Sequence, residues 1–479
     1  MTFKARVLIA LKWSIIGRIS TQVVSWAVSI LVMRALMPSD YGLVAMASIF
    51  TGLFGLVAEI GMGSSLVQAK DVTSQQLREV FGLVLLSNFI VFLILAMLIA
   101  PLASFIFNEP QVTGILRIVA LQFIPAAFSV LPTALLERSM QYKGRAAADF
   151  VANIGGALLT LWMAYHGYGA LSLAWGAVLT ALIRTLLLNC LMPFKQLPVL
   201  RLRGNGTMIH FGKNVAANQL AYYFLAQVDS LIVGKVLGQT QLGFYSVAMN
   251  LASMPASRVG AILNQVAFPA MSMVKREGGD VTRYFLRGIR SVSFVAFPVM
   301  WGMSALTPEL IYGLLGPTWT NAVLPMMLLC LIMPLRMLGP VINATLQSVG
   351  RADISLRNTC TTAVVMCAAF FVGCQFGLRG LALAWVIIFP LVFMFNVSLA
   401  SRHLNLAIAD FAWSLTRPVT VTAIMYGVIV ASRNCFTLPP LSMLAVLALI
   451  GACTYFLASV ILNRAGVAEL LAIIRPSAA

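Results

Sequence analysis

Charged residues are scarce in this sequence. Only 10% of its 479 residues are charged, whereas 60% are hydrophobic, and the mean hydropathy is +0.94. A soluble domain carries about 25% charged residues, so this composition excludes one. We expect the chain to lie in a bilayer, where each helical span needs about 20 mainly apolar residues.

Long polar segments are missing too. The breaks between apolar runs are too short to hold a soluble domain on either side of a membrane. The runs are continuous, whereas a membrane β-barrel has short alternating segments. We count about fourteen runs of spanning length, which predicts an all-α polytopic membrane protein with about fourteen transmembrane helices.

Signals of enzymatic or cofactor chemistry are absent. The sequence has no Walker loop, no glycine-rich dinucleotide fingerprint and no cluster of metal ligands. Cys360, Cys367 and Cys374 recur every seven residues, but no histidine or carboxylate completes a site beside them, so packing of small side chains explains the spacing. We therefore expect no catalytic residue, no metal and no cofactor.

Acidic residues are few, 14 against 32 Lys and Arg. If the N-terminus is cytoplasmic, the even-numbered breaks and both termini hold 23 of these 32 basic residues. The positive-inside rule is then satisfied with both chain ends in the cytoplasm. The basic residues on or near the other face are Arg34, Arg117, Lys235, Arg379 and Arg433. The net charge of +18 thus reflects topology and attraction to anionic lipid, and it needs no nucleic-acid partner.

Three pairs of phrases recur about 200 residues apart and in the same order along the chain. They are Ser29 to Ala47 with Ser230 to Ala248, Gly144-Arg-Ala146 with Gly350-Arg-Ala352, and Leu171-Ser-Leu-Ala-Trp175 with Leu381-Ala-Leu-Ala-Trp385. Such recurrence implies a duplicated six-helix unit, whose copies are related by a pseudo-two-fold axis along the membrane normal with a cavity between them. We predict an N-terminal lobe at 1–207, a C-terminal lobe at 208–410, and two further helices with a short tail at 411–479.

Polar side chains follow one face of several predicted helices. At about 100° per residue, Arg18 shares a stripe with Gln22 and with serines on either side. Polar groups facing lipid would be unsatisfied, so these stripes should line a wet interior. The predicted cavity residues are Arg18, Gln22, Glu59, Asn214, Asn218, Asp229, Asn250, Arg258, Asn264 and Arg336.

Other roles are open for some of these charges. Arg18 could snorkel to the cytoplasmic surface. Glu59 and Asp229 could be salt-bridge partners of the arginines. Arg34 and Lys235 occupy corresponding repeat positions at the outer ends of helices one and seven, where we predict an outer gate. Snorkelling is the alternative role for this pair as well.

Short motifs at helix ends carry a family resemblance over essentially the whole chain. They are Ala10-Leu-Lys-Trp-Ser14, Asp40-Tyr-Gly-Leu43, Gly61-Met-Gly-Ser-Ser-Leu-Val-Gln68, Phe268-Pro-Ala270, Gly316-Pro-Thr-Trp319 and Gly350-Arg-Ala-Asp-Ile354. With them the sequence resembles the polysaccharide transporter family of the multidrug/oligosaccharidyl-lipid/polysaccharide (MOP) flippase superfamily. Within that family it is similar to colanic acid exporters and O-antigen flippases of the Wzx type.

The resemblance implies a transporter with two six-helix bundles and alternating access. Its cargo would be an undecaprenyl-pyrophosphate-linked oligosaccharide repeat unit, moved across the bacterial inner membrane for exopolysaccharide or lipopolysaccharide biosynthesis. Membrane lipids, a polysaccharide polymerase and export machinery are the implied partners. The sequence is more remotely similar to lipid II flippases, which have cavity arginines in helices one and eight. Arg18 and Arg258 occupy those helices here.

The residues themselves agree with an anionic cargo. Guanidinium groups offer a fork of charge-assisted donors to pyrophosphate, and amides suit sugar hydroxyls. Two alternatives remain. A drug or cation exporter of the same superfamily would want uncompensated carboxylates in its cavity, and a membrane-embedded glycan polymerase or ligase would need a large outer loop with catalytic residues.

Overall fold

The computed structural model describes residues 26–59, 73–139, 141–193, 197–199, 206–277, 279–404, 406–464 and 466. Over these ranges the regular elements are all helices. Ten of the helices are long and apolar enough to cross a membrane, or eleven if one bent pair counts as a single span. The prediction of an all-helical, multi-pass membrane protein is confirmed, and the count of fourteen helices stays a prediction.

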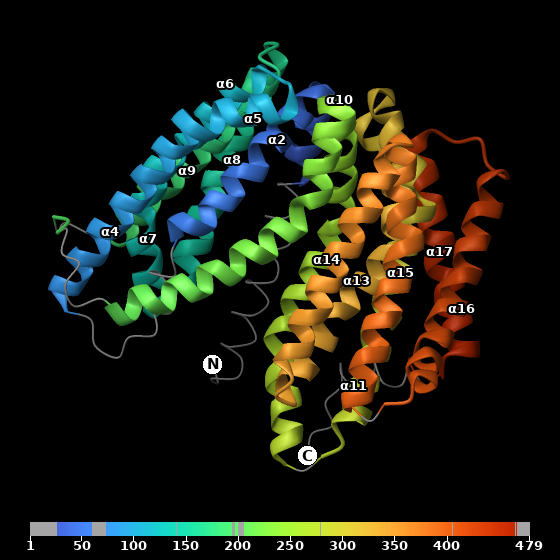
Figure 1. Ribbon diagram of the computed structural model, residues 1–479. Coiled ribbons are helices and arrows are strands. Elements are labelled where there is room, and N and C mark those ends of the chain that lie inside the picture. Colours follow the sequence, from blue (N-terminus) through green and yellow to red (C-terminus); the bar gives the residue numbers. More distant parts are fainter. Residues whose placement is uncertain are drawn as a thin grey trace, which may run out of the picture. The chain divides into compact units, whose positions relative to one another are not determined.

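The chain divides into two compact units, Met1–Gly243 and Phe244–Ala479. The first contains an apolar helix at Trp26–Ala35. It is followed by α2 (Pro38–Glu59), α4 (Ser74–Leu93), the π-helical η1 (Ile94–Ile99), α5 (Ala100–Phe107), α6 (Gln111–Ala120), α7 (Phe123–Arg138), α8 (Tyr142–Tyr165) and α9 (Ala170–Leu191). Within this unit α8 packs along α9, and α7 packs against both α4 and α9 (Figure 1).

The second unit is built around α13. Its elements are α11 (Val281–Ala305), α12 (Thr307–Leu310), η2 (Ile311–Leu315), η3 (Pro317–Ala322), α13 (Val323–Ser348), α14 (Ala352–Cys374), α15 (Gly377–Leu404), α16 (Ile408–Arg433) and α17 (Pro440–Leu462). Helix α13 packs against α11 on one side and α15 on another, while α14 pairs with α15 and α16 with α17. Helix α13 therefore contacts other helices of its unit on more than one side.

Local sequence signals explain where several helices begin. Thr73 and Gln76 form a capping box at α4, in which the Thr73 side chain accepts from the Gln76 amide and the Gln76 side chain accepts from the Thr73 amide. Asp280 caps α11 by accepting from the amides of Thr282 and Arg283. These caps lie in polar breaks and set the start of the apolar runs that follow.

A sharp break divides the long helix α10 (Gly206–Arg276). Gly238 has φ 80° and ψ −179° there, a conformation that glycine adopts readily and other residues do not. With the repeat offset of 201, Gly238 corresponds to Met37, which lies in the break between the Trp26–Ala35 helix and α2. Both copies of the Ser29 to Ala47 phrase are thus interrupted at the same position.

The helices that follow these two breaks cross at glycines. A Cβ built on Gly42 of α2 would overlap the carbonyl oxygen of Gln239, and a Cβ built on Gly243 would overlap the carbonyl oxygen of Pro38. The offset of 201 relates Gly42 to Gly243 and Pro38 to Gln239. The two contacts are therefore reciprocal at the repeat offset that the sequence predicts.

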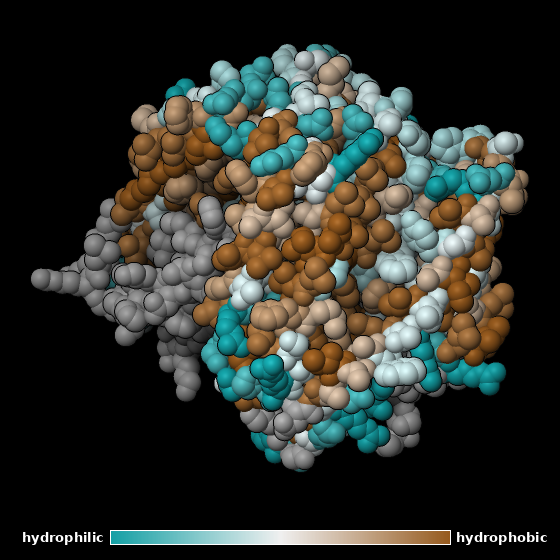
Figure 2. Space-filling view, turned by 45° about the vertical axis from the view of Figure 1, so that its right-hand side comes forward, coloured by the Kyte–Doolittle hydropathy of each residue, from teal (hydrophilic) through white to brown (hydrophobic). Residues whose placement is uncertain are grey.

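The surface matches a membrane setting. On the face that Figure 2 presents, hydrophobic residues cover the middle, and hydrophilic residues gather toward the upper and lower margins. Large apolar side chains lie exposed on many helices, among them Phe105 at 79%, Phe376 at 74% and Trp413 at 70%. Exposed side chains of this size in such number suit contact with lipid and not with water.

Candidate functional site

Arg336 lies in the middle of a membrane span. It stands thirteen residues after Val323 and twelve before Ser348, the two ends of α13. At 1.5 Å per residue it is about 18 Å or more from either end, too far for its side chain to snorkel to an interface. Arg336 is nevertheless exposed. A guanidinium cannot face hydrocarbon at that depth, so it must face a wet space.

An aromatic ring holds Arg336 in place. The Arg336 Cζ atom lies 4.6 Å from the centroid of the Trp385 ring, within the range of a cation–π interaction. Its Nη1 contacts the Met249 sulfur at 3.7 Å, a weak acceptor. Among the described residues, these are the contacts that the Arg336 side chain makes, and neither is with a carboxylate.

The Trp385 ring is itself fixed. Its Nε1–H donates to the hydroxyl of Tyr245 at 3.0 Å, and both residues are buried. Phe370 and Phe389 pack against the ring, with centroids 5.0 Å and 5.4 Å away. Arg336 therefore rests on a platform that cannot easily turn.

The structure places two other predicted cavity residues. Asn250 directly follows Met249 on α10 and is exposed. Asp229 is buried, and its Oδ1 accepts from the backbone amide of Ser230 at 2.7 Å. Asp229 belongs to the first unit, and Asn250 and Arg336 belong to the second.

Several predicted cavity residues fall outside what the structure describes. The structure describes neither the backbone nor the side chain of Arg18 and Gln22, and it describes only the backbone of the other members of this set. The full set is Arg18, Gln22, Glu59, Asn214, Asn218, Arg258 and Asn264. The outer-gate pair is described, and both Arg34 and Lys235 are exposed. A substrate role for all of these residues stays a prediction.

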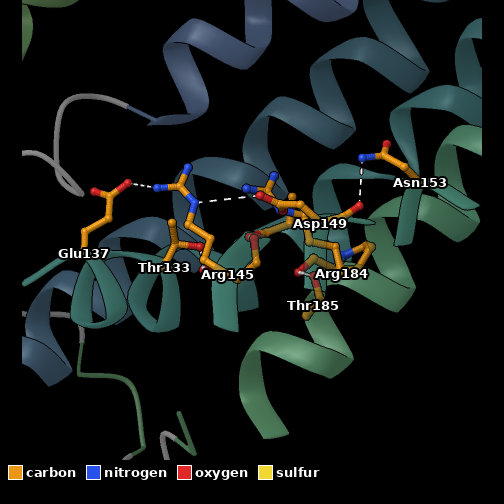
Figure 3. A network of polar contacts seen from close by, with 10 residues as sticks. Thr133, Glu137, Arg145, Asp149, Asn153, Arg184 and Thr185 are labelled. Atoms are coloured by element: carbon orange, nitrogen blue, oxygen red, sulfur yellow. Dashed lines mark hydrogen bonds and ion pairs between the residues drawn. The ribbon is translucent and has the colours of Figure 1, made fainter. Parts of the chain in front are cut away.

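A second group of charges joins three helices of the first unit. Arg145 of α8 pairs with Glu137 of α7, and Asp149 lies between Arg145 and Arg184 of α9 (Figure 3). The Nε of Arg184 is 2.8 Å from Asp149 Oδ1, but its N–H is not aimed at that oxygen, so the contact is an ion pair and not a hydrogen bond. Two arginines and two carboxylates balance, which suits a structural role.

A third arginine is paired near an end of the second unit. Arg433 of α16 holds Glu309 of α12 through two contacts, Nε to Oε1 at 2.8 Å and Nη2 to Oε2 at 3.0 Å. Its Nη2 also donates to the carbonyl of Ala305, beside the bend between α11 and α12. In the first unit, Arg117 likewise donates to a helical carbonyl, that of Ala96 in the π-helix η1, at 3.1 Å.

Basic groups gather at one end of the second unit. The Thr282 hydroxyl near the start of α11 donates to the carbonyl of Leu404 at the end of α15, so these helix ends meet. Next to them, Arg351 Nη1 is 3.0 Å from His403 Nδ1. Hydrogen bonds to Asp353 raise the pKa of Arg351 above its ordinary value and keep it charged. A cytoplasmic location for this end stays a prediction of the positive-inside rule.

Comparison with known families decides the wider identity. The profile of the family described as "Polysaccharide biosynthesis protein" matches residues 31–324, well over half of the chain. The chain belongs to this family. The match covers most of the first unit and extends into the second as far as the start of α13.

The relatives of known name share only a small part of their sequence with this chain. It is 23% identical to "Teichuronic acid biosynthesis protein TuaB" of Bacillus subtilis over 84% of each chain. It is 20% identical to "Lipopolysaccharide biosynthesis protein WzxC" of Escherichia coli, over 81% of this chain and 79% of the relative. It is 23% identical to "Succinoglycan biosynthesis transport protein ExoT" of Rhizobium meliloti, over 65% and 63%.

Solved structures identify the fold. A structure titled "Lipid II flippase MurJ, inward closed conformation" superposes with a TM-score of 0.74 at 12% identity, over 94% of this chain and 98% of that one. An inward-facing multidrug resistance MATE transporter of the MOP superfamily gives 0.62 at 14%, over 80% and 94%. The predicted family is confirmed, and the chain has the fold of these MOP transporters.

Sequence reasoning missed the residues that hold Arg336. Trp385 was visible only as part of a repeated phrase, and Tyr245 and Met249 carried no signal of their own. Met249 lies 87 residues before Arg336 in the chain. Tyr245 lies 140 residues before Trp385. Such contacts arise from helix packing and leave no periodic pattern in the chain.

Proposed function

We propose that this transporter is a flippase for an undecaprenyl-pyrophosphate-linked oligosaccharide repeat unit and moves it across the bacterial inner membrane for exopolysaccharide or lipopolysaccharide biosynthesis. The observation that carries the proposal is Arg336, an exposed arginine at mid-membrane that has no carboxylate contact among the described residues. A cation in that setting favours an anionic cargo. The names of TuaB, WzxC and ExoT support a cargo used in polysaccharide biosynthesis.

The paired carboxylates argue against a cation exporter. Such a transporter would need acidic groups free to receive its cargo. Here Glu137, Asp149 and Glu309 each lie against an arginine. Their charge is already compensated, so they give a cationic drug no site.

Export of a pyrophosphate headgroup has a ready driving force. When the cell interior is electrically negative, moving negative charge outward is favourable by about 2.3 kcal/mol per charge per 100 mV. The membrane potential would therefore assist each turnover, and a coupled cation would be an addition and not a requirement. We also propose that both termini lie in the cytoplasm. The basic groups around Arg351 support this orientation, because basic residues favour the cytoplasmic side.

We further propose two lobes of six helices, at 1–207 and 208–410, that alternate about a pseudo-two-fold axis. The reciprocal contacts of Gly42 and Gly243 support this symmetry. Arg34 and Lys235 precede these glycines by eight residues in each copy and would form the outer gate. A disulfide between cysteines introduced at 34 and 235 would then stop transport while leaving the protein folded.

The function is tested by loss and rescue. Deletion of the gene should cause a lipid-linked oligosaccharide to accumulate on the cytoplasmic leaflet, and mass spectrometry of extracted lipids would identify it. The wild-type gene should clear the accumulation, whereas Arg336→Gln should not, although its protein level and melting temperature stay near those of wild type. A deletion strain with normal lipid-linked intermediates and normal surface polysaccharide would reject the function.

A further inference from the structure

We propose that Trp385 and Tyr245 are positioning residues which make Arg336 a receptor for a pyrophosphate group. This inference rests on the proposed function, because it concerns the headgroup of the same cargo. The aromatic platform aims the guanidinium without neutralising it. A carboxylate partner could aim the group as well, but only by cancelling the charge that the cargo needs.

The other arginines of the structure show what a carboxylate partner does. Glu309 receives both Nε and Nη2 of Arg433, so the two-pronged edge of that guanidinium is occupied. In the first unit Arg145 and Arg184 share Asp149. An anion arriving at any of these arginines would have to displace a carboxylate, whereas at Arg336 it would displace water.

The geometry at Arg336 keeps the donors available. A guanidinium has five N–H groups in its plane, and a cation–π contact uses the face of the group. With the Trp385 ring on the face and the Met249 sulfur beside Nη1, Nε and Nη2 have no protein acceptor among the described residues. That edge is the one that binds phosphate oxygens in pairs.

The hydrogen bond from Trp385 to Tyr245 fixes the platform. Trp385 is 7% exposed and Tyr245 is fully buried, so the ring can turn only by breaking a buried hydrogen bond. The repeat counterpart of Trp385 is Trp175, which is 40% exposed. The second copy of the Leu-x-Leu-Ala-Trp phrase has thus buried its tryptophan where the first copy has not, as expected of a residue that supports a site.

The chain offers a matched control. Trp301 of α11 also donates its Nε1–H to a partly buried acceptor, the carbonyl of Leu331 at 3.0 Å, and also packs between aromatic rings, those of Phe297 and Tyr426. Among the described residues, its hydrogen-bond and ring partners include no arginine. Trp301→Phe therefore disturbs packing as Trp385→Phe does, and it leaves the platform of Arg336 intact.

The test measures binding of inorganic pyrophosphate to the purified full-length protein by calorimetry. Arg336→Gln should abolish binding, and Trp385→Leu should weaken it by about three- to tenfold, in the range of a cation–π contact. Trp385→Phe and Tyr245→Phe should weaken it less, and Trp301→Phe should not change it. Wild-type affinity in Trp385→Leu, with unchanged thermal unfolding, would overturn the proposal, as would equal losses in Trp301→Phe and Trp385→Phe.

Fluorinated tryptophan separates positioning from packing. Ring fluorines draw electron density from the face and weaken its hold on a cation, with little change in shape. Affinity should fall stepwise with the number of fluorines in the wild-type protein, and this trend should vanish in the Trp385→Phe background. A trend that persists in that background, or no trend at all, would reject the platform.

The source of the pyrophosphate is a separate arm of the same experiment. Farnesyl pyrophosphate should bind more tightly than inorganic pyrophosphate if the site serves a lipid-linked cargo, and with the same dependence on Trp385. Failure of the flippase function would appear instead as normal lipid-linked intermediates in the deletion strain. Binding that depends on Trp385 in a protein without that phenotype would leave the site standing and the function rejected.

Discussion

Gly42 and Gly243 lie where their two helices cross, and each glycine packs against the first turn of the other helix. A side chain on Gly42 would overlap the backbone of Gln239, and one on Gly243 would overlap the backbone of Pro38. Backbone atoms cannot rotate out of the way as a flexible side chain can. The crossing therefore depends on both glycines.

Gly42→Ala should force the two helices apart. Overpacking of this kind costs about 1–3 kcal/mol, so we expect a lower melting temperature and impaired transport. Because the contacts are reciprocal, Gly243→Ala should have a similar effect. Gly114→Ala is the control, since an added Cβ there meets no atom within 4 Å, and alanine in a helix is favoured over glycine by about 0.5–1 kcal/mol. Wild-type stability and transport in Gly42→Ala would contradict the close crossing.

Asp149→Asn should destabilise the first unit more than loss of either arginine that contacts it. The substitution leaves Arg145 and Arg184 facing each other without their shared carboxylate. These side chains are partly exposed, so each ion pair is worth about 1 kcal/mol or less. Adding Arg184→Met should recover part of the loss, which a double-mutant cycle of thermal unfolding would measure. Unchanged stability together with lost transport would instead assign the network to the substrate path.

Glu309→Gln should loosen the contact between α12 and α16. The side chain of Glu309 is 9% exposed and that of Arg433 is 30% exposed, so removing the carboxylate leaves a largely buried guanidinium without its partner. We expect a loss of about 1–3 kcal/mol in unfolding free energy. The double variant Glu309→Gln/Arg433→Met should be more stable than Glu309→Gln alone. A single variant that unfolds like wild type would show that water already screens this pair.

Labelling of single cysteines tests the orientation. Cys435 is exposed in the break between α16 and α17, and Gly279 is exposed before α11. In intact spheroplasts, a membrane-impermeant maleimide should label Cys435 in a background that lacks other cysteines. It should leave Gly279→Cys unlabelled until the membrane is opened. The reverse pattern would place the basic end of the second unit outside and overturn the topology.

Much of the architecture could be predicted from sequence, because hydropathy and helical periodicity are local properties. Runs of about 20 apolar residues can only be helices in lipid, and the described spans fall where those runs lie. The shared phrases gave the repeat offset of 201, which the paired breaks at Met37 and Gly238 now obey. The position of Arg336 between Pro334 and Pro340, deep in an apolar run, was equally readable.

Tertiary packing decided which charges are compensated. In the sequence Arg184, Arg336 and Arg433 are each a basic residue in an apolar run or at its end, and nothing local gives their partners. Packing gives Asp149 to the first and Glu309 to the third, and it gives the second an aromatic ring from another helix. Each of these partners comes from another helix, so no pattern within one helix could reveal them. The sequence alone determined that the protein spans a membrane and carries charge within it, and only helix packing determined that Arg336 keeps its charge exposed.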